Sequence, residues 1–168
     1  MEAIADERRR LEAVKEDADV VIDTSELNVA QLRERLGELF SGDETVMQIL
    51  VLSFGFKHGV PLDVDNVLDV RFLPNPYWVE GLRNLSGLDG PVRDYVLDQA
   101  EAKEFLERAE HLLEFLVPAY IREGKSYLTI AVGCTGGRHR SVVLAEEIAR
   151  RLRRLGYGPS TIHRDVDR

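Results

Sequence analysis

The pattern of apolar and polar positions separates a short amino-terminal stretch from a longer, more regular one. Residues 2–17 predict a helix with a weak apolar stripe, and Val20–Ile22 predict a short strand. Asn28 stands where an N-cap is expected, ahead of a helix over residues 29–40 that ends at Gly42. One strand and two helices are too small for a core of their own. We therefore expect residues 1–44 to be the end of a larger domain.

From residue 45 onward, buried apolar runs alternate with segments of helical periodicity. Pro74 and Pro76 predict an extended loop after the second of these runs. Strands that alternate with helices favour an α/β fold, with a central sheet flanked by helices. The expected strands are residues 45–54, 67–70, 126–132 and 160–164, and the expected helices are residues 90–123, in one or two pieces, and 141–155.

Composition excludes several classes of protein. The 168 residues are 44% hydrophobic, which is too apolar for a disordered acidic chain. A single cysteine excludes a disulfide scaffold and a zinc site built from cysteines. No apolar run approaches the roughly 18 residues that cross a bilayer, and the charged N-terminus lacks the apolar segment of a secretory signal. We expect a soluble cytoplasmic protein that needs neither a membrane, a metal nor a cofactor.

The net charge of −8 conceals an excess of basic residues near the C-terminus. Residues 134–168 carry 8 Lys and Arg against 4 Asp and Glu. A polyanionic partner such as RNA is therefore expected at this end. The alternative is a solvated helix end, where the helix dipole favours cations. The candidate side chains are Arg150, Arg151, Arg153, Arg154, His163 and Arg164.

The segment that carries the clearest chemistry runs from a buried strand through a glycine-rich turn into a helix. It reads YLTIAVGCTGGRHRS over residues 127–141. Such a turn directs backbone N–H groups and the positive end of a helix dipole at one point, which favours an anion. Arg138, His139 and Arg140 add positive charge, and a guanidinium binds phosphate through two parallel hydrogen bonds. The sequence therefore predicts a phosphate or carboxylate site.

The same loop also matches the Cys-x5-Arg pattern of cysteine-dependent phosphatases, from Cys134 to Arg140. In that reading Cys134 is the nucleophile, and the helix N-terminus and nearby cations lower its pKa. Gly133 replaces the histidine that usually precedes this cysteine, and no Trp-Pro-Asp segment supplies a general acid. Phosphatase chemistry remains the alternative function, whereas the absence of Gly-x-x-x-x-Gly-Lys-Ser/Thr argues against a nucleotide P-loop in residues 1–168.

Three further polar residues follow the first two strands. Lys57 comes directly after the first strand, and Asp69 and Arg71 flank the end of the second. Ligands of α/β sheets bind at the carboxyl ends of the strands. If the strands are parallel neighbours, these side chains and the loop 134–140 surround one pocket.

Four motifs follow one another along the chain: SFGFKHGVPLD (residues 53–63), DVRFLPNPYW (69–78), GLDGPV (87–92) and SYLTIAVGCTGGRHRSV (126–142). Together they resemble the C-terminal domain of the RapZ/YvcJ family of RNase adapter proteins. Residues 20–32, VVIDTSELNVAQL, resemble the last stretch of the kinase-like N-terminal domain of that family. The resemblance implies that residues 1–44 are a remnant of that domain and residues 45–168 are the adaptor domain.

The resemblance implies a fold related to a phosphofructokinase lobe and a role without established catalysis. In the best-known members this domain senses glucosamine-6-phosphate, binds small regulatory RNA and presents it to an endoribonuclease, and full-length members form homo-oligomers. Carried over by motif, Thr135, Gly136, Gly137 and Arg140 would hold the phosphate, supported by His139 and Ser141. The positions that would line or buttress the same pocket are Lys57, Asp69, Asn75, Tyr77 and Cys134.

Two departures from the family pattern change the expected contacts. Tyr77 stands where an RNA-binding member has histidine, so one polar ligand contact differs. The chain ends HRDVDR, with two acids where that member has a lysine-rich tail, and acids repel RNA phosphates. We therefore predict a domain that binds a phosphorylated amino sugar, with Asp69 or Asn75 reading its hydroxyl or ammonium groups.

Overall fold

The chain forms two compact units, Met1–Thr45 and Val46–Arg168. The computed structural model describes residues 6–7, 10–12, 14–15, 17–40 and 47–168. Within these ranges, no helix combines the length and the apolar character that crossing a membrane requires.

The amino-terminal unit contains helix α2, Val29–Phe40, as its sequence predicts. Asn28 caps this helix: the backbone N–H of Gln31 donates to Asn28 Oδ1, and the Asn28 N–H donates to Gln31 Oε1. This reciprocal pair satisfies N–H groups that a helix start leaves without partners. The predicted strand at Val20–Ile22 is wrong, because these residues pair with no strand among those described. The described residues between 6 and 15 are helical, whereas the end predicted at Gly42 lies outside the described residues.

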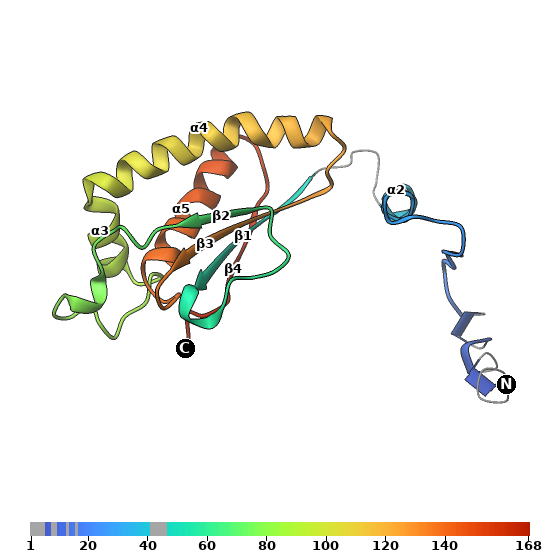
Figure 1. Cartoon of the computed structure of the whole chain (residues 1–168), viewed down its shortest axis with the longest axis horizontal. Helices are drawn as coiled ribbons and strands as arrows, with labels where there is room; N and C mark the ends of the chain where they lie inside the picture. Colours follow the sequence, from blue (N-terminus) through green and yellow to red (C-terminus); the bar gives the residue numbers. More distant parts are fainter. Residues whose placement is uncertain (1–5, 8–9, 13, 16, 41–46) are drawn as a thin grey trace. The chain divides into compact units, whose positions relative to one another are not determined.

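The carboxy-terminal unit is built on a parallel sheet of four strands (Figure 1). The strand order is β2-β3-β1-β4, so the longest strands lie in the centre. This arrangement confirms the layered α/β fold. The strands are β1 Gln48–Gly55, β2 Asn66–Asp69, β3 Tyr127–Cys134 and β4 Ser160–His163.

Alternation along β1 and β3 directs every second side chain to one face of the sheet. Ile49 and Val51 of β1 lie opposite Leu128 and Ile130 of β3, and all four are buried. Helix α5, Arg140–Arg154, packs against these strands and lies behind the sheet in Figure 1. Removal of this face from water is the main stabilising contribution to the unit.

Two further helices complete the apolar core over α5. Helix α3, Gly90–Asp98, is separated from helix α4, Ala100–Arg122, by the extended backbone of Gln99. The prediction of a helical segment in one or two pieces is thus confirmed as two. Leu106 and Leu113 of α4 are buried as expected, but Leu112 is 48% exposed because it lies on the outer side of the helix.

The connections at the carboxyl ends of β1 and β2 contain short 3-10 helices, η1 Phe56–His58 and η2 Pro76–Trp78. The prediction of an extended loop at Pro74–Pro76 is therefore wrong in its second half. Pro76 begins a helical turn, because its fixed φ suits the first helical position and its missing N–H is not needed there.

Candidate functional site

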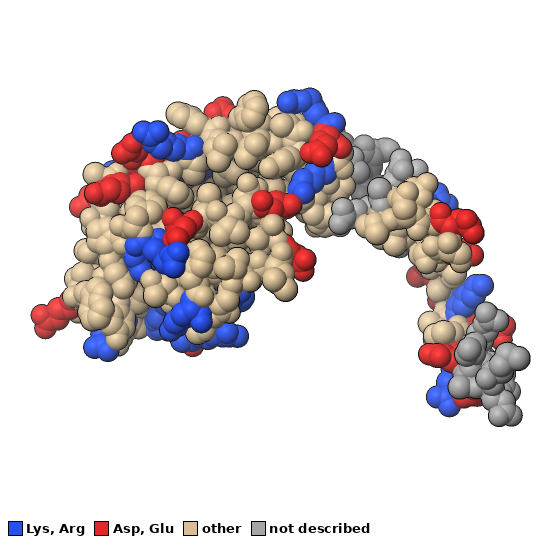
Figure 2. All heavy atoms as spheres, in the orientation of Figure 1, with Lys and Arg blue, Asp and Glu red and all other residues tan. Residues whose placement is uncertain are grey.

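The parallel register brings the predicted site residues to one edge of the sheet. Gly55 at the end of β1 lies beside Cys134 of β3, and Asp69 at the end of β2 lies beside Gly133. Lys57, the Asp69–Arg71 segment and the loop after β3 therefore follow three neighbouring strand ends. Figure 2 shows basic side chains gathered along this edge of the carboxy-terminal unit. The edge has the location and the charge that an anion site requires.

The loop between β3 and α5 is pressed closely against the end of β1. A Cβ atom at Gly137 would lie 2.7 Å from Gly55 N, and one at Gly55 would lie 2.5 Å from Gly136 C. Gly137 also has φ +81°, which side chains with a Cβ rarely adopt. Two glycines are thus needed where β1 and the loop meet.

Three backbone N–H groups of this loop, those of Gly136, Arg138 and His139, have no backbone acceptor among the described residues. These residues lead directly into α5, whose first N–H groups have no acceptor within the helix. The helix dipole adds positive potential at this end. Such an arrangement binds phosphate in many α/β proteins.

Cys134 lies buried at the base of the loop. Its Sγ accepts a hydrogen bond from Gly137 N at 3.2 Å and shares one with Ser141 Oγ at 3.1 Å. Both contacts cross-link the end of β3 to the start of α5, which gives Cys134 a structural role.

Arg140 points into the protein, with only 4% of its surface exposed. Its Nη1 donates to the carbonyl oxygens of Arg71 at 2.9 Å and Leu73 at 2.8 Å, and its Nη2 donates to Thr135 Oγ1 at 3.3 Å. Its Nε has no hydrogen-bond partner among the described residues, and no described carboxylate forms an ion pair with it. Burial lowers the pKa of Arg140, and nearby Cys134 and Asp69 oppose that change. Arg140 is thus a buried cation that holds the 71–73 turn against the loop.

Arg138 and His139 hold the other side of the loop. The Arg138 guanidinium donates to the carbonyl oxygens of Asn84, Leu85 and Val166. His139 is buried, and its Nε2 has no partner among the described residues. Burial lowers the pKa of His139, and the adjacent arginines lower it further. Backbone hydrogen bonding to Leu85 and Arg83 acts in the opposite direction but does not reverse the lowering of the pKa, so the neutral form of the imidazole is favoured.

The exposed rim of the site consists of Lys57, Asp69 and Arg71. The Lys57 side chain is exposed, and its backbone N–H donates to Thr135 O at 3.2 Å. Asp69 accepts hydrogen bonds from the Arg71 guanidinium, with the shortest contact at 2.6 Å, and these bonds lower the pKa of Asp69. The Arg71 guanidinium also lies 4.0 Å from the centre of the Phe56 ring. The rim thus offers two cations and one carboxylate to solvent.

Asn75 and Tyr77 are engaged in local contacts at η2. Asn75 Oδ1 accepts a hydrogen bond from Tyr77 N at 3.4 Å, and so caps the 3-10 turn. Arg83 donates to the Tyr77 hydroxyl and stacks over the Tyr77 ring. Among the described residues, the hydrogen bond from Arg140 Nη1 to Leu73 O connects this segment to Arg140.

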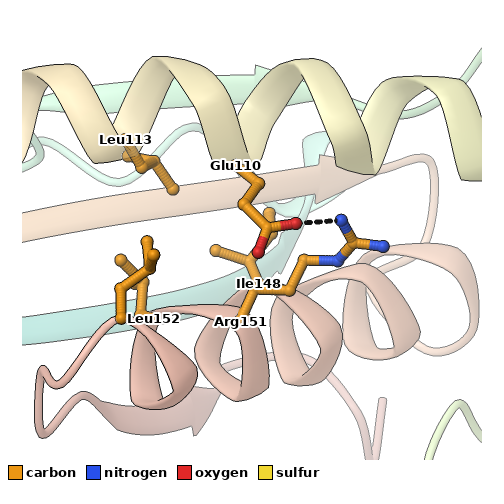
Figure 3. Close-up of a pocket in the computed structure, with 6 residues that line it drawn as sticks. Glu110, Leu113, Ile148, Arg151 and Leu152 are labelled. Carbon is orange, nitrogen blue, oxygen red and sulfur yellow. Dashed lines mark hydrogen bonds and ion pairs between the residues drawn. The ribbon is translucent and has the colours of Figure 1, made fainter.

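The basic residues at the end of α5 are paired with acids. Glu147 receives hydrogen bonds from Arg150 and Arg151, and Glu110 of α4 receives them from Arg151 and Arg154. Burial acts to raise the pKa of Glu147, but the bonds from the two arginines lower it overall. Figure 3 shows Arg151 facing Glu110 beside the apolar pocket between the two helices. These pairs join α4 to α5 and reduce the charge available to a polyanion, while Arg153 donates to Pro159 O.

His163 and Arg164 also have partners within the unit. His163 Nδ1 bonds to the buried Ser53 hydroxyl at 2.9 Å, and Nε2 bonds to Glu146 Oε1 at 3.1 Å. Arg164 Nη2 donates to Gly59 O at 2.7 Å and to Asp165 Oδ2 at 2.7 Å. The structure therefore places these two residues at the same strand ends as the loop, but with their polar groups engaged.

Two residues of this region are not anticipated from the sequence. Asp165 is fully buried and accepts a hydrogen bond from Gly55 N at 2.8 Å. Gly55 is the second glycine of the close contact with the loop. The sequence offers only a weak signal for either, because an acid in a charged C-terminal tail usually faces solvent.

Comparison with known proteins identifies both parts of the chain. Residues 47–167 match the model of the RapZ C-terminal domain, and residues 1–44 match that of the RapZ-like N-terminal domain. A nucleotide-binding protein of Thermobifida fusca (strain YX) is 52% identical over 168 residues, which cover 99% of this chain and 57% of that protein. The nucleotide-binding protein SCO1952 of Streptomyces coelicolor is 51% identical over 169 residues, which cover 100% of this chain and 56% of the relative.

A nucleotide-binding protein of Trichlorobacter lovleyi is similar to the same degree, at 51% identity over 99% of this chain and 59% of its own length. The chain thus spans little more than half the length of these relatives. The predicted resemblance is confirmed by the two domain matches, which together account for nearly every residue. The chain belongs to the RapZ family.

Proposed function

We propose that the carboxy-terminal unit is a sensor domain that binds a phosphorylated amino sugar, such as glucosamine-6-phosphate, at the loop Cys134–Ser141. The observation that carries the proposal is the set of free backbone N–H groups at the start of α5. An anion at this point meets these donors and the helix dipole together. Family membership supports the choice of a phosphosugar over other anions.

Each group at the loop has a distinct part in this proposal. The amides of Gly136, Arg138 and His139 hold the phosphate, and Lys57 adds an exposed positive charge beside Gly136. The Arg140 guanidinium donates to the carbonyl oxygens of Arg71 and Leu73, which hold it beneath the loop. From this position its positive charge attracts the phosphate. Asp69, ionised and at the rim, attracts the ammonium group of the amino sugar.

The experiment that tests the proposal is isothermal titration of the full chain with glucosamine-6-phosphate, glucose-6-phosphate and inorganic phosphate. We expect saturable binding of all three, with the amino sugar bound most tightly because only it pairs an ammonium group with Asp69. Equal affinity for all three would reduce the loop to a general anion site. No binding at all would contradict the proposal and favour an RNA or protein partner.

The relatives carry the name nucleotide-binding protein, and their length exceeds that of this chain. Residues 1–168 contain no P-loop motif, so in this proposal the loop binds a sugar phosphate rather than a nucleoside triphosphate. Small RNA, an endoribonuclease and further copies of the chain are proposed as partners of the whole cytoplasmic protein. The arginines at the end of α5 are expected to contribute little to RNA affinity, because most are paired with carboxylates.

A cysteine-dependent phosphatase is the second candidate, since Gly137 N and Ser141 Oγ both contact Cys134 Sγ. The two candidates differ in what Cys134→Ser does. If Cys134 is structural, we expect the variant to bind the phosphosugar nearly as tightly as the wild type, because serine also accepts from Gly137 N. If instead the wild type hydrolyses p-nitrophenyl phosphate and Cys134→Ser releases no measurable phosphate, the protein is a cysteine-dependent phosphatase.

A further inference from the structure

The last turn of the chain is folded under the anion-binding loop. The backbone N–H of Arg164 donates to Ser53 O at 3.0 Å, which extends the pairing between β4 and β1. Asp165 follows, with no exposed surface. Its Oδ2 accepts from Gly55 N at 2.8 Å and from Arg164 Nε at 3.0 Å and Nη2 at 2.7 Å. One carboxylate oxygen thus joins the C-terminal turn to the end of β1.

Asp165 also packs directly against the loop. A Cβ atom at Gly137 would lie 2.7 Å from Asp165 Cβ, so the two residues have no room between them. On the next residue, Val166 O accepts a hydrogen bond from Arg138 Nη1 at 3.0 Å. The C-terminal turn therefore contacts the loop at two points and contacts Gly55, the residue on which the loop rests.

We propose that Asp165 is a positioning residue of the anion-binding loop, and this inference rests on the proposed phosphosugar function. Its carboxylate fixes the Gly55 N–H and Arg164, and its side chain supports Gly137 from behind. The free amides of Gly136, Arg138 and His139 are then held in a single arrangement before a ligand arrives. A site that is formed in advance loses less entropy on binding, which raises its affinity.

The charge of Asp165 does not oppose this role. Arg164 holds it on one side, and Arg168 Nη1 lies 3.4 Å from Asp165 Oδ1 on the other. Burial acts to raise the pKa of Asp165, but Arg164, the Gly55 N–H and nearby His58 lower it overall. The carboxylate therefore stays ionised and accepts these hydrogen bonds throughout the neutral pH range.

The test compares Asp165→Asn with Asp167→Asn in the full chain, using titration with glucosamine-6-phosphate. Both variants remove one negative charge from the same turn, but Asp167 is exposed. If Asp165 only added negative charge near the site, its removal would strengthen anion binding. We expect the opposite: affinity at least about tenfold weaker in Asp165→Asn, because a neutral amide oxygen accepts the bonds from Gly55 N–H and Arg164 more weakly than a carboxylate does, and no weakening in Asp167→Asn. Equal affinities in the two variants would overturn the inference.

Amide hydrogen exchange, measured by NMR without ligand, separates this inference from the proposed function. In Asp165→Asn we expect the N–H of Gly55 and of Gly137 to exchange faster than in Asp167→Asn, with β3 unchanged. Faster exchange together with a wild type that binds no phosphosugar would refute the proposed function but keep the positioning role. Unchanged exchange would refute the positioning role.

If Asp165→Asn does not fold, Arg164→Gln provides the second test. This variant leaves the Asp165 carboxylate in place but removes the Arg164 donors to it. Arg108→Gln on α4 is its control, because it removes the same charge from a side chain that is 78% exposed and makes no contact with Asp165 among the ion pairs of the described residues. We expect weaker phosphosugar binding and faster Gly55 exchange only in Arg164→Gln, and equal behaviour of the two variants would overturn the inference.

Discussion

Gly137→Ala is expected to lower the free energy of unfolding of the carboxy-terminal unit and to abolish phosphosugar binding. The backbone at Gly137 has φ +81°, which costs an alanine about 1–2 kcal/mol. Its Cβ would also lie 2.7 Å from both Gly55 N and Asp165 Cβ, and relieving such overlap costs about 1–3 kcal/mol more. Urea denaturation followed by far-UV circular dichroism measures the first effect, and titration with glucosamine-6-phosphate measures the second.

Gly136→Ala is the matched control, one residue away in the same loop. A Cβ at Gly136 would meet only the end of the Lys57 side chain, at 3.8 Å, which is ordinary contact with a flexible group. The variant should therefore unfold at nearly the urea concentration of the wild type. If Gly137→Ala were as stable as Gly136→Ala, the close contact between the loop and the end of β1 would not exist in solution.

The difference between these two glycines shows what the sequence predicts and what it leaves open. The pattern strand, glycines, helix predicts the loop and its affinity for anions, because that geometry depends on local backbone conformation. It does not show which glycine faces solvent and which faces Gly55, since that contact joins residues 82 positions apart. Only the pairing of β1 with β3 places them together.

The fold, too, is predicted well where it depends on local sequence and poorly where it depends on distant partners. The strands β1 and β3 and the helix α5 are predicted closely, because their apolar periodicity is long and regular. Val20–Ile22 are apolar and β-branched as well, yet form no strand, because β structure depends on a partner and not on the residues alone.

The directions in which the side chains of the site point cannot be predicted from local sequence patterns. Arg140 is expected to grip phosphate, but its guanidinium is directed to the carbonyl oxygens of Arg71 and Leu73. These carbonyl groups come from another loop, so no spacing along the chain reveals them. Asp165 is another example, because its burial depends on the parallel pairing of β4 with β1, which brings the residues after β4 to Gly55.

Arg140→Met is expected to weaken phosphosugar binding by about 10–100-fold, which is the range for loss of a charged hydrogen-bonding group. The substitution keeps an unbranched side chain of similar length but removes the charge beneath the loop and frees the 71–73 turn. The effect on stability should be smaller. Losing the bonds to Arg71 O and Leu73 O destabilises the unit, whereas removing a buried cation without a carboxylate partner stabilises it.

Arg140→Lys separates the two contributions of this side chain, and Arg108→Met on the exposed face of α4 controls for the change in net charge. Lysine restores a positive charge but cannot donate from one planar group to Arg71 O, Leu73 O and Thr135 Oγ1 together. If charge alone matters, Arg140→Lys should bind nearly as tightly as the wild type. If the planar group orders the turn and the loop, as the geometry indicates, lysine should be almost as weak as methionine. Full affinity in Arg140→Met would place the anion elsewhere on the unit, because among the described residues no other side chain of Cys134–Ser141 hydrogen-bonds to the turn that follows β2.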